Sequence, residues 1–514
     1  MVVPGARVCR GRRSAVTASL CGIGLGCAAL ASVSVAEAHG VWAHIHVTGW
    51  AIDNQPDEEL RDFFSDPEVL NAALYGAAFT DSGYWPQAGE LSRRSRAYSE
   101  HTHWEPFVQD FVAWIIAHDP PPWTSVESKK RVAFLLGCAS HGLQDELFDS
   151  VFLYQVRTHD GKDQEEADPG TDGFFAKDRW ITRIPTEYIP MDTVLELYAG
   201  LGQGVDEATI RQSVDLLNFI YLGNPEAAAA LGTRYESIIP WTREHYLDPA
   251  IPGSIASEVF PTMRYQQAIW RRLHGQLPVD APVVVSAFPD APRRLHGADS
   301  TAPDSWATLI FAEGVRYSTT APTWQDDQGE PVPFDRANTR WGATWPRLIR
   351  LQPTAPLVPG AWTTVSLPAG AERIDGQLTT TPFSLRFQVP CDDATASDCA
   401  DLGALPTPDL GEPAPEPEMD AGLDAEPDAS TPDADPTPDA ALDAEPDAPP
   451  LDTGLAVDVA ADGASNGHIP PTADASDDGG CACGVTPRRV APSGAAWALL
   501  ALVAAVWTRA RRGP

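Results

Sequence analysis

The stretch FLLGCASHGLQDELFDSVFL, residues 134–153, sets polar side chains at regular intervals into an apolar background. His141, Asp145 and Asp149 lie four residues apart, so on a helix they follow one face within about 80°. The apolar residues on both sides favour a buried position for these three. A buried carboxylate without a partner costs several kcal/mol, and a metal ion would supply the partner. The alternative is a solvated polar stripe on a surface helix.

Helical periodicity extends on both sides of this stretch, over residues 39–277. Apolar residues recur at helical spacing, with long Pro-, Gly- and Asp-rich connections between the periodic segments. Gly137 and Gly142 argue against one unbroken helix in the central segment. The expected helices cover residues 105–118, 129–156, 207–222 and 257–273. This pattern predicts an all-α domain.

The pattern changes near residue 278. Short β-prone runs follow, and Pro and Gly punctuate them at intervals suited to a β-sandwich. These runs lie within residues 283–285, 306–317, 348–351, 362–367 and 383–389. Their order resembles bacterial Ig-like domains. We therefore expect a multi-domain chain in which an all-β Ig-like sandwich, 278–391, follows the helical domain.

Most of the negative charge lies in one segment. The chain has 71 acidic and 36 basic residues, a formal net charge of −35. Residues 391–480 hold 24 of the acids and no Lys or Arg, and they repeat Asp, Pro and Ala. Such a composition predicts a disordered linker over 392–480. The charge excludes a basic nucleic-acid footprint for the chain as a whole, and no apolar run is long enough for a polytopic membrane protein.

Both ends look like targeting segments. A basic start, an apolar run and the A-x-A site Ala36-Glu37-Ala38 predict a signal peptide over 1–38, which leaves His39 as the first mature residue. Residues 481–514 combine a Cys motif, a short apolar run and an Arg cluster, and they resemble the MYXO-CTERM type of sorting tail. That resemblance implies processing by a sorting protease and display at the cell surface. The alternatives are an uncleaved N-terminal anchor and an ordinary C-terminal membrane anchor.

The cysteines agree with export. Cys391 and Cys399 enclose a short Asp-rich loop and could pair in an oxidising compartment. Cys138 stands alone in an apolar helical run, which favours a buried small hydrophobe over a nucleophile.

Further candidate ligands are spread along the helical segment. His39 and His44 follow the cleavage site, Asp81 lies in TDSGYWP, His103 lies in HTHWEPF, and Asp168 and Asp172 lie four apart in ADPGTDGF. Taken singly, each is more often a cap, a turn or a surface residue. As an ordered set with His141 and Asp145, they resemble the zinc-dependent phospholipase C superfamily. That group includes bacterial phospholipases C, single-strand-specific nucleases and the N-terminal domain of glycosylphosphatidylinositol-specific phospholipase D.

The resemblance implies a set of metal ligands, with the first mature residue binding through its amino and carbonyl groups. The implied ligands are His39, His44, Asp81, His103, His141, Asp145, Asp149, Asp168 and Asp172. Asp149 and Asp168 stand where the family uses His, and His159-Asp160 lies nearby as an alternative. Several zinc ions are implied, with Mn²⁺, Fe²⁺ or Ca²⁺ possible at the carboxylate-rich positions because these are harder ligands.

The resulting prediction is an exported, monomeric phosphodiesterase that hydrolyses phospholipid with a metal-activated water. Asp81 would bind metal and position or deprotonate the water. Tyr84, Trp85 and Trp104 would line the substrate approach, although core packing is the alternative for these aromatic residues. Two other functions stay open. One is a surface adhesion protein with a structural or vestigial metal site, and the other is a nuclease, which the acidic balance disfavours.

Overall fold

The computed structural model describes residues 40–86, 89–288, 306–317, 321–337, 345–390 and 406–415. All of these residues belong to one compact unit, which lies within Met1–Leu423. His39, Cys391, Cys399, the predicted signal peptide and the predicted sorting tail lie outside them. Among the described helices, none is long and apolar enough to cross a membrane.

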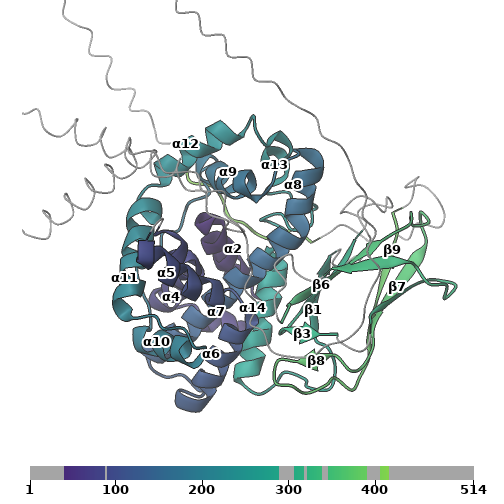
Figure 1. Ribbon diagram of the computed structural model, residues 1–514, viewed down its shortest axis with the longest axis horizontal. Coiled ribbons are helices and arrows are strands. Elements are labelled where there is room, and N and C mark those ends of the chain that lie inside the picture. Colours follow the sequence, from purple (N-terminus) through teal and green to yellow (C-terminus); the bar gives the residue numbers. More distant parts are fainter. Residues whose placement is uncertain are drawn as a thin grey trace, which may run out of the picture. The chain divides into compact units, whose positions relative to one another are not determined.

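The first part of the described chain is helical (Figure 1). Its elements are α2 (Val41–Asp53), α3 (Glu58–Phe63), α4 (Pro67–Phe79), the 3₁₀ helix η1 (Thr80–Tyr84), α5 (Gly89–Thr102), α6 (Glu105–His118), α7 (Val126–Leu147), the π-helix η2 (Phe148–Phe152), α8 (Leu153–His159), α9 (Gln164–Lys177), α10 (Met191–Gly200), α11 (Glu207–Leu216), the π-helix η3 (Leu217–Leu222), α12 (Pro225–Tyr235), α13 (Pro240–His245) and α14 (Val259–Leu273).

The ends of these helices follow from local chemistry. Ser125 caps the N-terminus of α7, and its hydroxyl accepts the Ser128 N–H at 3.0 Å, which satisfies one of the free donors of the first turn. Asp66 caps α4 in the same way and Pro67 follows it, where a missing N–H costs nothing. The expected helix over 105–118 is confirmed as α6.

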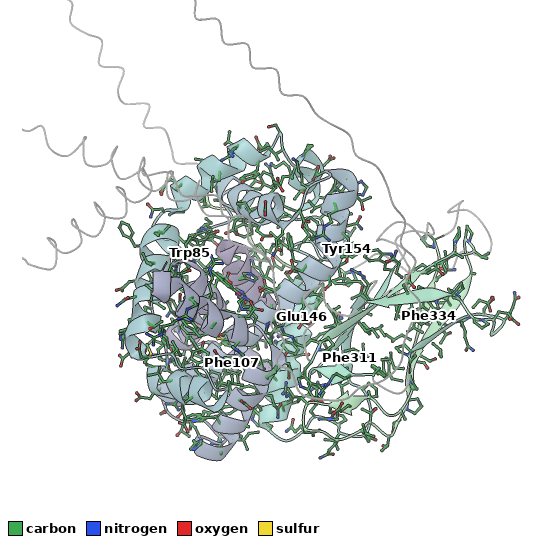
Figure 2. The ribbon with its side chains drawn as sticks, viewed as in Figure 1. Trp85, Phe107, Glu146, Tyr154, Phe311 and Phe334 are labelled. Carbon is green, nitrogen blue, oxygen red and sulfur yellow. The ribbon has the colours of Figure 1, made fainter. Side chains whose placement is uncertain are left out.

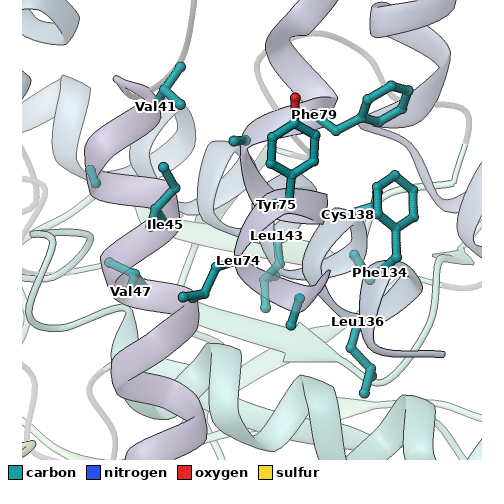
Figure 3. Close-up of a cluster of buried hydrophobic side chains, with 14 of the residues drawn as sticks. Val41, Ile45, Val47, Leu74, Tyr75, Phe79, Phe134, Leu136, Cys138 and Leu143 are labelled. Carbon is teal, nitrogen blue, oxygen red and sulfur yellow. The ribbon is translucent and has the colours of Figure 1, made fainter. Parts of the chain in front are cut away.

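Helices α2, α4 and α7 contribute buried apolar side chains to one cluster of the helical core (Figure 3). Two glycines let α4 and α7 approach closely. A Cβ at Gly137 would lie 2.0 Å from the Ala73 carbonyl oxygen, and one at Gly76 would lie 2.4 Å from that of Phe134. Only glycine therefore permits this crossing. The same crossing brings the C-terminal end of α4, and Asp81 beyond it, alongside α7.

The second part of the described chain consists of antiparallel strands. They are β1 (Val284–Phe288), β2 (Ala307–Phe311), β3 (Val315–Arg316), β4 (Thr323–Asp326), β5 (Phe334–Ala337), β6 (Leu348–Pro353), β7 (Trp362–Leu367), β8 (Glu372–Arg373) and β9 (Phe383–Gln388). They form sheets in the orders β1-β2-β6-β5, β4-β7-β9 and β3-β8. The predicted layout of helices followed by antiparallel β-structure is confirmed.

The strands enclose a core of their own. In β7 buried and half-buried residues alternate, as expected when one face of a sheet is covered. The buried side chains of this second core include Leu309, Trp324, Leu351, Val365 and Phe387.

Residues 406–415 lie against the helical part. Asn54 donates from Nδ2 to the Asp409 carbonyl at 2.8 Å, and the Asp409 N–H returns to Asn54 Oδ1 at 3.0 Å. The Ala414 N–H bonds the Arg179 carbonyl at 2.8 Å, and Leu410 packs on the helical core. The expectation of a disordered linker over 392–480 therefore does not hold for these ten residues.

Candidate metal centre

Five side chains from four segments of the helical part converge. His44 lies on α2, Asp81 on η1, His103 between α5 and α6, and His141 and Asp145 on α7. They form two overlapping groups of potential metal ligands, one of His44, His141 and Asp145 and the other of Asp81, His103 and His141. All five are at most 5% exposed. The sequence placed the same five residues in one ligand set.

The ligand atoms of the five lie close together. Asp145 Oδ2 is 3.0 Å from His103 Nε2 and 3.2 Å from His141 Nε2, and Asp145 Oδ1 is 3.1 Å from His44 Nε2. Asp81 Oδ1 is 3.2 Å from His103 Nε2 and 3.3 Å from His141 Nε2. Two carboxylates thus face three imidazoles within a few ångströms.

The outer nitrogen of each of these imidazoles is held by a protein oxygen. His141 Nδ1 bonds the Ala77 carbonyl at 2.6 Å, and His103 Nδ1 bonds the Ser99 carbonyl at 2.7 Å. His44 Nδ1 bonds Gln144 Oε1 at 2.8 Å. Because an oxygen without a proton can only accept, each Nδ1 carries the hydrogen in the neutral ring, and each Nε2 offers a lone pair inward. Fixing of the outer nitrogen is typical of histidine that binds a metal.

The two inward nitrogens of His103 and His141 are 3.2 Å apart. With both Nδ1 atoms protonated, two lone pairs face each other there, which is unfavourable unless a positive charge lies between or beside them. The residues present therefore fit a divalent cation, and imidazole with carboxylate is a donor set that zinc accepts.

The pKa shifts of these groups also favour a cation in the site. Burial opposes ionisation of Asp81, but the nearby His141 and His103 lower the pKa of this carboxyl to about 2. Burial also opposes ionisation of Asp145, but His141, His44 and His103 hold the pKa of its carboxyl well below the ordinary value. Burial disfavours the charged ring of His141, yet Asp81 and Asp145 raise its pKa to about 9. Both carboxylates thus require positive charge beside them, from protons or from a metal ion.

The structure does not bring Asp149, Asp168 and Asp172 into either group of ligands. All three are buried. Asp149 lies on η2, while Asp168 and Asp172 lie on α9. Asp172 accepts the N–H groups of Trp42 at 3.2 Å and Ala43 at 3.1 Å, and burial raises the pKa of its carboxyl to about 8.

Asp172 therefore caps the start of α2. A Cβ at Gly40 would lie 1.8 Å from the Asp172 carboxyl carbon, so residue 40 must be glycine for the chain to begin α2 there. His39 itself lies outside the described residues, directly before this contact.

The three candidate substrate residues differ in position. Tyr84 and Trp104 flank His103, with ring centroids 5.6 and 6.3 Å from its ring. Both donate to Glu100, Tyr84 from its hydroxyl at 2.8 Å and Trp104 from Nε1 at 3.0 Å. Trp85 is 3% exposed and packs on Tyr221 at 4.8 Å, so its ring is part of the core.

Sequence reasoning missed several residues around the five. Gln144 and Glu146 flank Asp145, and the four-residue spacing of the ligand motif selects neither. Glu258, at the start of α14, is buried, and burial followed by the charge of Asp145 raises the pKa of its carboxyl well above the ordinary value. No local pattern predicts that residue 258 lies near residue 145.

Comparison with known proteins gives a partial match. No family model matches the chain. Over 201 residues the chain is 27% identical to phosphatidylinositol-glycan-specific phospholipase D of Rattus norvegicus, a match that covers 36% of this chain and 23% of the rat protein. The Bos taurus protein of the same name is 32% identical over 139 residues, 24% of this chain and 16% of that protein.

The chain thus spans about a quarter of the length of the curated relatives it matches. These partial similarities indicate a distant, phospholipase-like relationship. Among solved structures, CopC from Methylosinus trichosporium OB3b is 18% identical and covers 22% of this chain and 96% of its own, with a TM-score of 0.17. At that score the likeness supports no statement about the fold.

Proposed function

We propose that the protein is a metal-dependent phosphodiesterase that hydrolyses phospholipids in the manner of a phospholipase C. The observation that carries the proposal is the convergence of three imidazole Nε2 atoms on two buried carboxylates, with each Nδ1 fixed from outside. The similarity to phospholipases D supports a phosphodiester as the substrate.

Zinc is the ion that suits this donor set best. His44, His141 and Asp145 form one candidate ligand set, and Asp81 and His103 with His141 form the other. One ring nitrogen binds one ion, so His141 serves one of the two sets. When bound, divalent ions neutralise and orient a phosphodiester and make water acidic enough to attack it at neutral pH.

Asp81 would orient the attacking water. Its Oδ1 faces His103 and His141, while its buried Oδ2 has no hydrogen-bond partner within the described part of the chain. A pKa of about 2 keeps this carboxylate ionised at neutral pH. Asp81 Oδ2 would accept a hydrogen bond from the water that attacks phosphorus. The water oxygen would form a new bond to phosphorus as the bond from phosphorus to the leaving alkoxide breaks, and the proton that the water loses would end on that alkoxide.

The other acidic candidates would extend the site. His39 as a mature N-terminus, with Asp149, Asp168 and Asp172, would complete the ligand set that the family resemblance implies. Carboxylates are harder ligands than imidazole, so Mn²⁺, Fe²⁺ or Ca²⁺ would compete better at these positions. Tyr84 and Trp104, held together by Glu100, would border the substrate beside His103.

We expect the enzyme to act outside the cytoplasm. A signal peptide over 1–38 would be removed, and the tail over 481–514 would be processed by a sorting protease. The Ig-like sandwich over 278–391 and the acidic segment would then hold the helical domain at the cell surface.

The test compares His141→Ala and Asp145→Asn with His101→Ala. The ring of His101 bonds Gln203 at 2.6 Å, and His101 belongs to neither ligand group. We expect the first two variants to lose bound zinc, and phospholipid hydrolysis should fall at least about a hundredfold because the remaining charges lose their ion. His101→Ala should keep both properties.

Metal content by mass spectrometry and product release from phospholipid vesicles provide the readouts. Single-stranded DNA as a second substrate distinguishes the nuclease alternative. A wild-type protein that binds zinc but cleaves neither substrate would favour the adhesion protein with a structural metal site, and hydrolysis that persists in His141→Ala would contradict the proposed centre.

A further inference from the structure

Arg347 in the β part of the chain contacts buried residues of the helical part. Arg347, directly before β6, is fully buried. Glu146 on α7, which Figure 2 labels, is buried as well. Arg347 donates from Nε to Glu146 Oε1 at 2.8 Å and from its backbone N–H to Glu146 Oε2 at 3.0 Å. One carboxylate thus receives both the side chain and the main chain of the same residue.

The same guanidinium also reaches a candidate metal ligand. Arg347 Nη2 donates to the carbonyl oxygen of His103 at 2.6 Å. The ring of His103 lies 3.0 Å from Asp145 and 3.2 Å from Asp81, and Glu146 directly follows Asp145. Arg347 therefore holds the main chain of one ligand and the neighbour of another.

Gly142 on α7 makes room for this arrangement. A Cβ at position 142 would lie 2.1 Å from the His103 carbonyl oxygen and 2.8 Å from Arg347 Nη2. Glycine is unfavourable within a helix, so its presence one residue after His141 agrees with a need for close approach. The planar fork of arginine suits two acceptors at once, which a lysine ammonium on a flexible stem does not.

Residues on α14 also bind the segment that carries His103. Glu105, two residues after His103, accepts the Tyr265 hydroxyl at 2.8 Å and Arg272 Nη1 at 2.8 Å. The Arg347 guanidinium lies 5.8 Å from the centre of the Tyr265 ring. The segment that carries His103 is thus fixed by charged and polar contacts from α7, α14 and the β part.

A buried ion pair is expensive to desolvate and is poor evidence for stability by itself. Its position here indicates another role. We infer that Arg347 is a positioning residue for the metal centre: by fixing the His103 carbonyl and Glu146, it sets the distance between His103 and Asp145, so the β part is required for tight metal binding. This inference rests on the proposed function, since it concerns the same centre.

The experiment uses the full exported protein, stripped with a chelator and titrated with Zn²⁺ or Co²⁺. Arg347→Met removes the charge and both hydrogen-bonding arms, while Arg347→Lys keeps the charge without the fork. Arg373→Met is the matched control, because Arg373 is also a buried arginine of the β part, paired with Glu313 at 2.7 Å.

We expect Zn²⁺ affinity to fall at least tenfold in Arg347→Met and by less in Arg347→Lys. The visible absorption of bound Co²⁺ should shift in both, because the ligand geometry changes, and kcat should fall more than KM rises. Arg373→Met should retain the affinity and the Co²⁺ spectrum even if its melting temperature drops as far. If Arg347→Met does not fold, the Zn²⁺ affinity and Co²⁺ spectrum of Arg347→Lys are compared with those of Arg373→Met.

Two results would overturn the inference alone. One is a wild-type protein that binds Zn²⁺ together with Arg347 variants of unchanged affinity and Co²⁺ spectrum. The other is an equal loss of affinity in Arg373→Met, which would assign the effect to general destabilisation. A wild-type protein that binds neither ion would instead remove the proposed function and this inference together.

Discussion

Two histidines on α2, two residues apart, have different roles because their ring nitrogens face different partners. His44 turns Nε2 towards Asp145. His46 uses both nitrogens within the fold, since Nδ1 bonds the Trp42 carbonyl at 2.8 Å and Nε2 accepts the N–H groups of Thr182 at 3.0 Å and Arg183 at 3.2 Å. His46 therefore joins α2 to the segment after α9 and has no nitrogen left for a ligand.

This bonding pattern predicts a pH-dependent stability. Burial lowers the pKa of His46 from 6.5 to about 4, with the charge of Arg183 acting in the same direction. Protonation would place a hydrogen on Nε2, facing two N–H donors. Between these pH values the unfolded chain binds the proton and the folded chain does not, so stability is complete above about pH 6.5 and falls as the pH drops towards 4, by ~3 kcal/mol from this ring.

The measurement is urea denaturation of wild type and His46→Gln between pH 7 and pH 4. Other groups also titrate in this range, and the difference between the two proteins isolates the ring. The variant should lose less stability on acidification than wild type does. Parallel curves for the two proteins would show that His46 is not the titrating group.

At the scale of elements, the crossing of α4 and α7 is what brings Asp81 to His141. Gly137→Ala would place a methyl group 2.0 Å from a backbone oxygen of α4, and neither helix can move without disturbing the buried residues shared between them. We expect a loss of ~2–3 kcal/mol in the free energy of unfolding and weaker metal binding. Gly200→Ala, at the end of α10 with nothing within 4 Å, should change stability by less than about 0.5 kcal/mol.

Denaturant unfolding and zinc titration of both variants provide the check. A Gly137→Ala protein as stable as Gly200→Ala would mean that the crossing has more room than the contact distances indicate.

The change from α7 to the π-helix η2 could not be predicted from the sequence. His141 and Asp145 could be paired from their spacing because α7 is a regular helix through Leu147. Asp149 was added by the same arithmetic, but η2 begins at Phe148, and a π-helix has more residues per turn than the 3.6 that the arithmetic assumes. No local signal in FDSVF marks that change.

The long-range contacts around the site lay beyond sequence reasoning for a different reason. Gln144, Glu258 and Arg347 act through partners that only the tertiary fold brings near, so periodicity says nothing about them. The helical and β-strand character of the two parts was predictable, because hydrophobic spacing and the distribution of Pro and Gly report it locally.

In the molecule as a whole, residues 406–415 follow the β part in sequence and pack against the helical part. Asn54→Ala removes both hydrogen bonds to Asp409, each worth about 1 kcal/mol. The bond of Ala414 to Arg179 and the packing of Leu410 remain, so the segment should open more often without leaving the helical part. We expect subtilisin to cleave within 406–415 several times faster in this variant, since backbone that opens locally is accessible to a protease.

Asn71→Ala is the control for this prediction. Its amide makes a similar pair of hydrogen bonds to Thr186, at 2.9 and 2.8 Å, without touching residues 406–415. Mass mapping of the early fragments gives the cleavage sites, and identical fragments and rates in the two variants would contradict a role for Asn54 in holding the segment.

The buried pair of Arg347 and Glu146 has a further consequence for how such a chain can be recombined. A graft of a foreign β module onto these helices would leave Glu146 as an uncompensated anion in the interior, at a cost of several kcal/mol. The helical part joined to any other β domain would have the same unpaired Glu146. The helical part and the β part therefore cannot be exchanged independently of each other. Related chains with this buried ion pair should have the same residues at positions 142, 146 and 347.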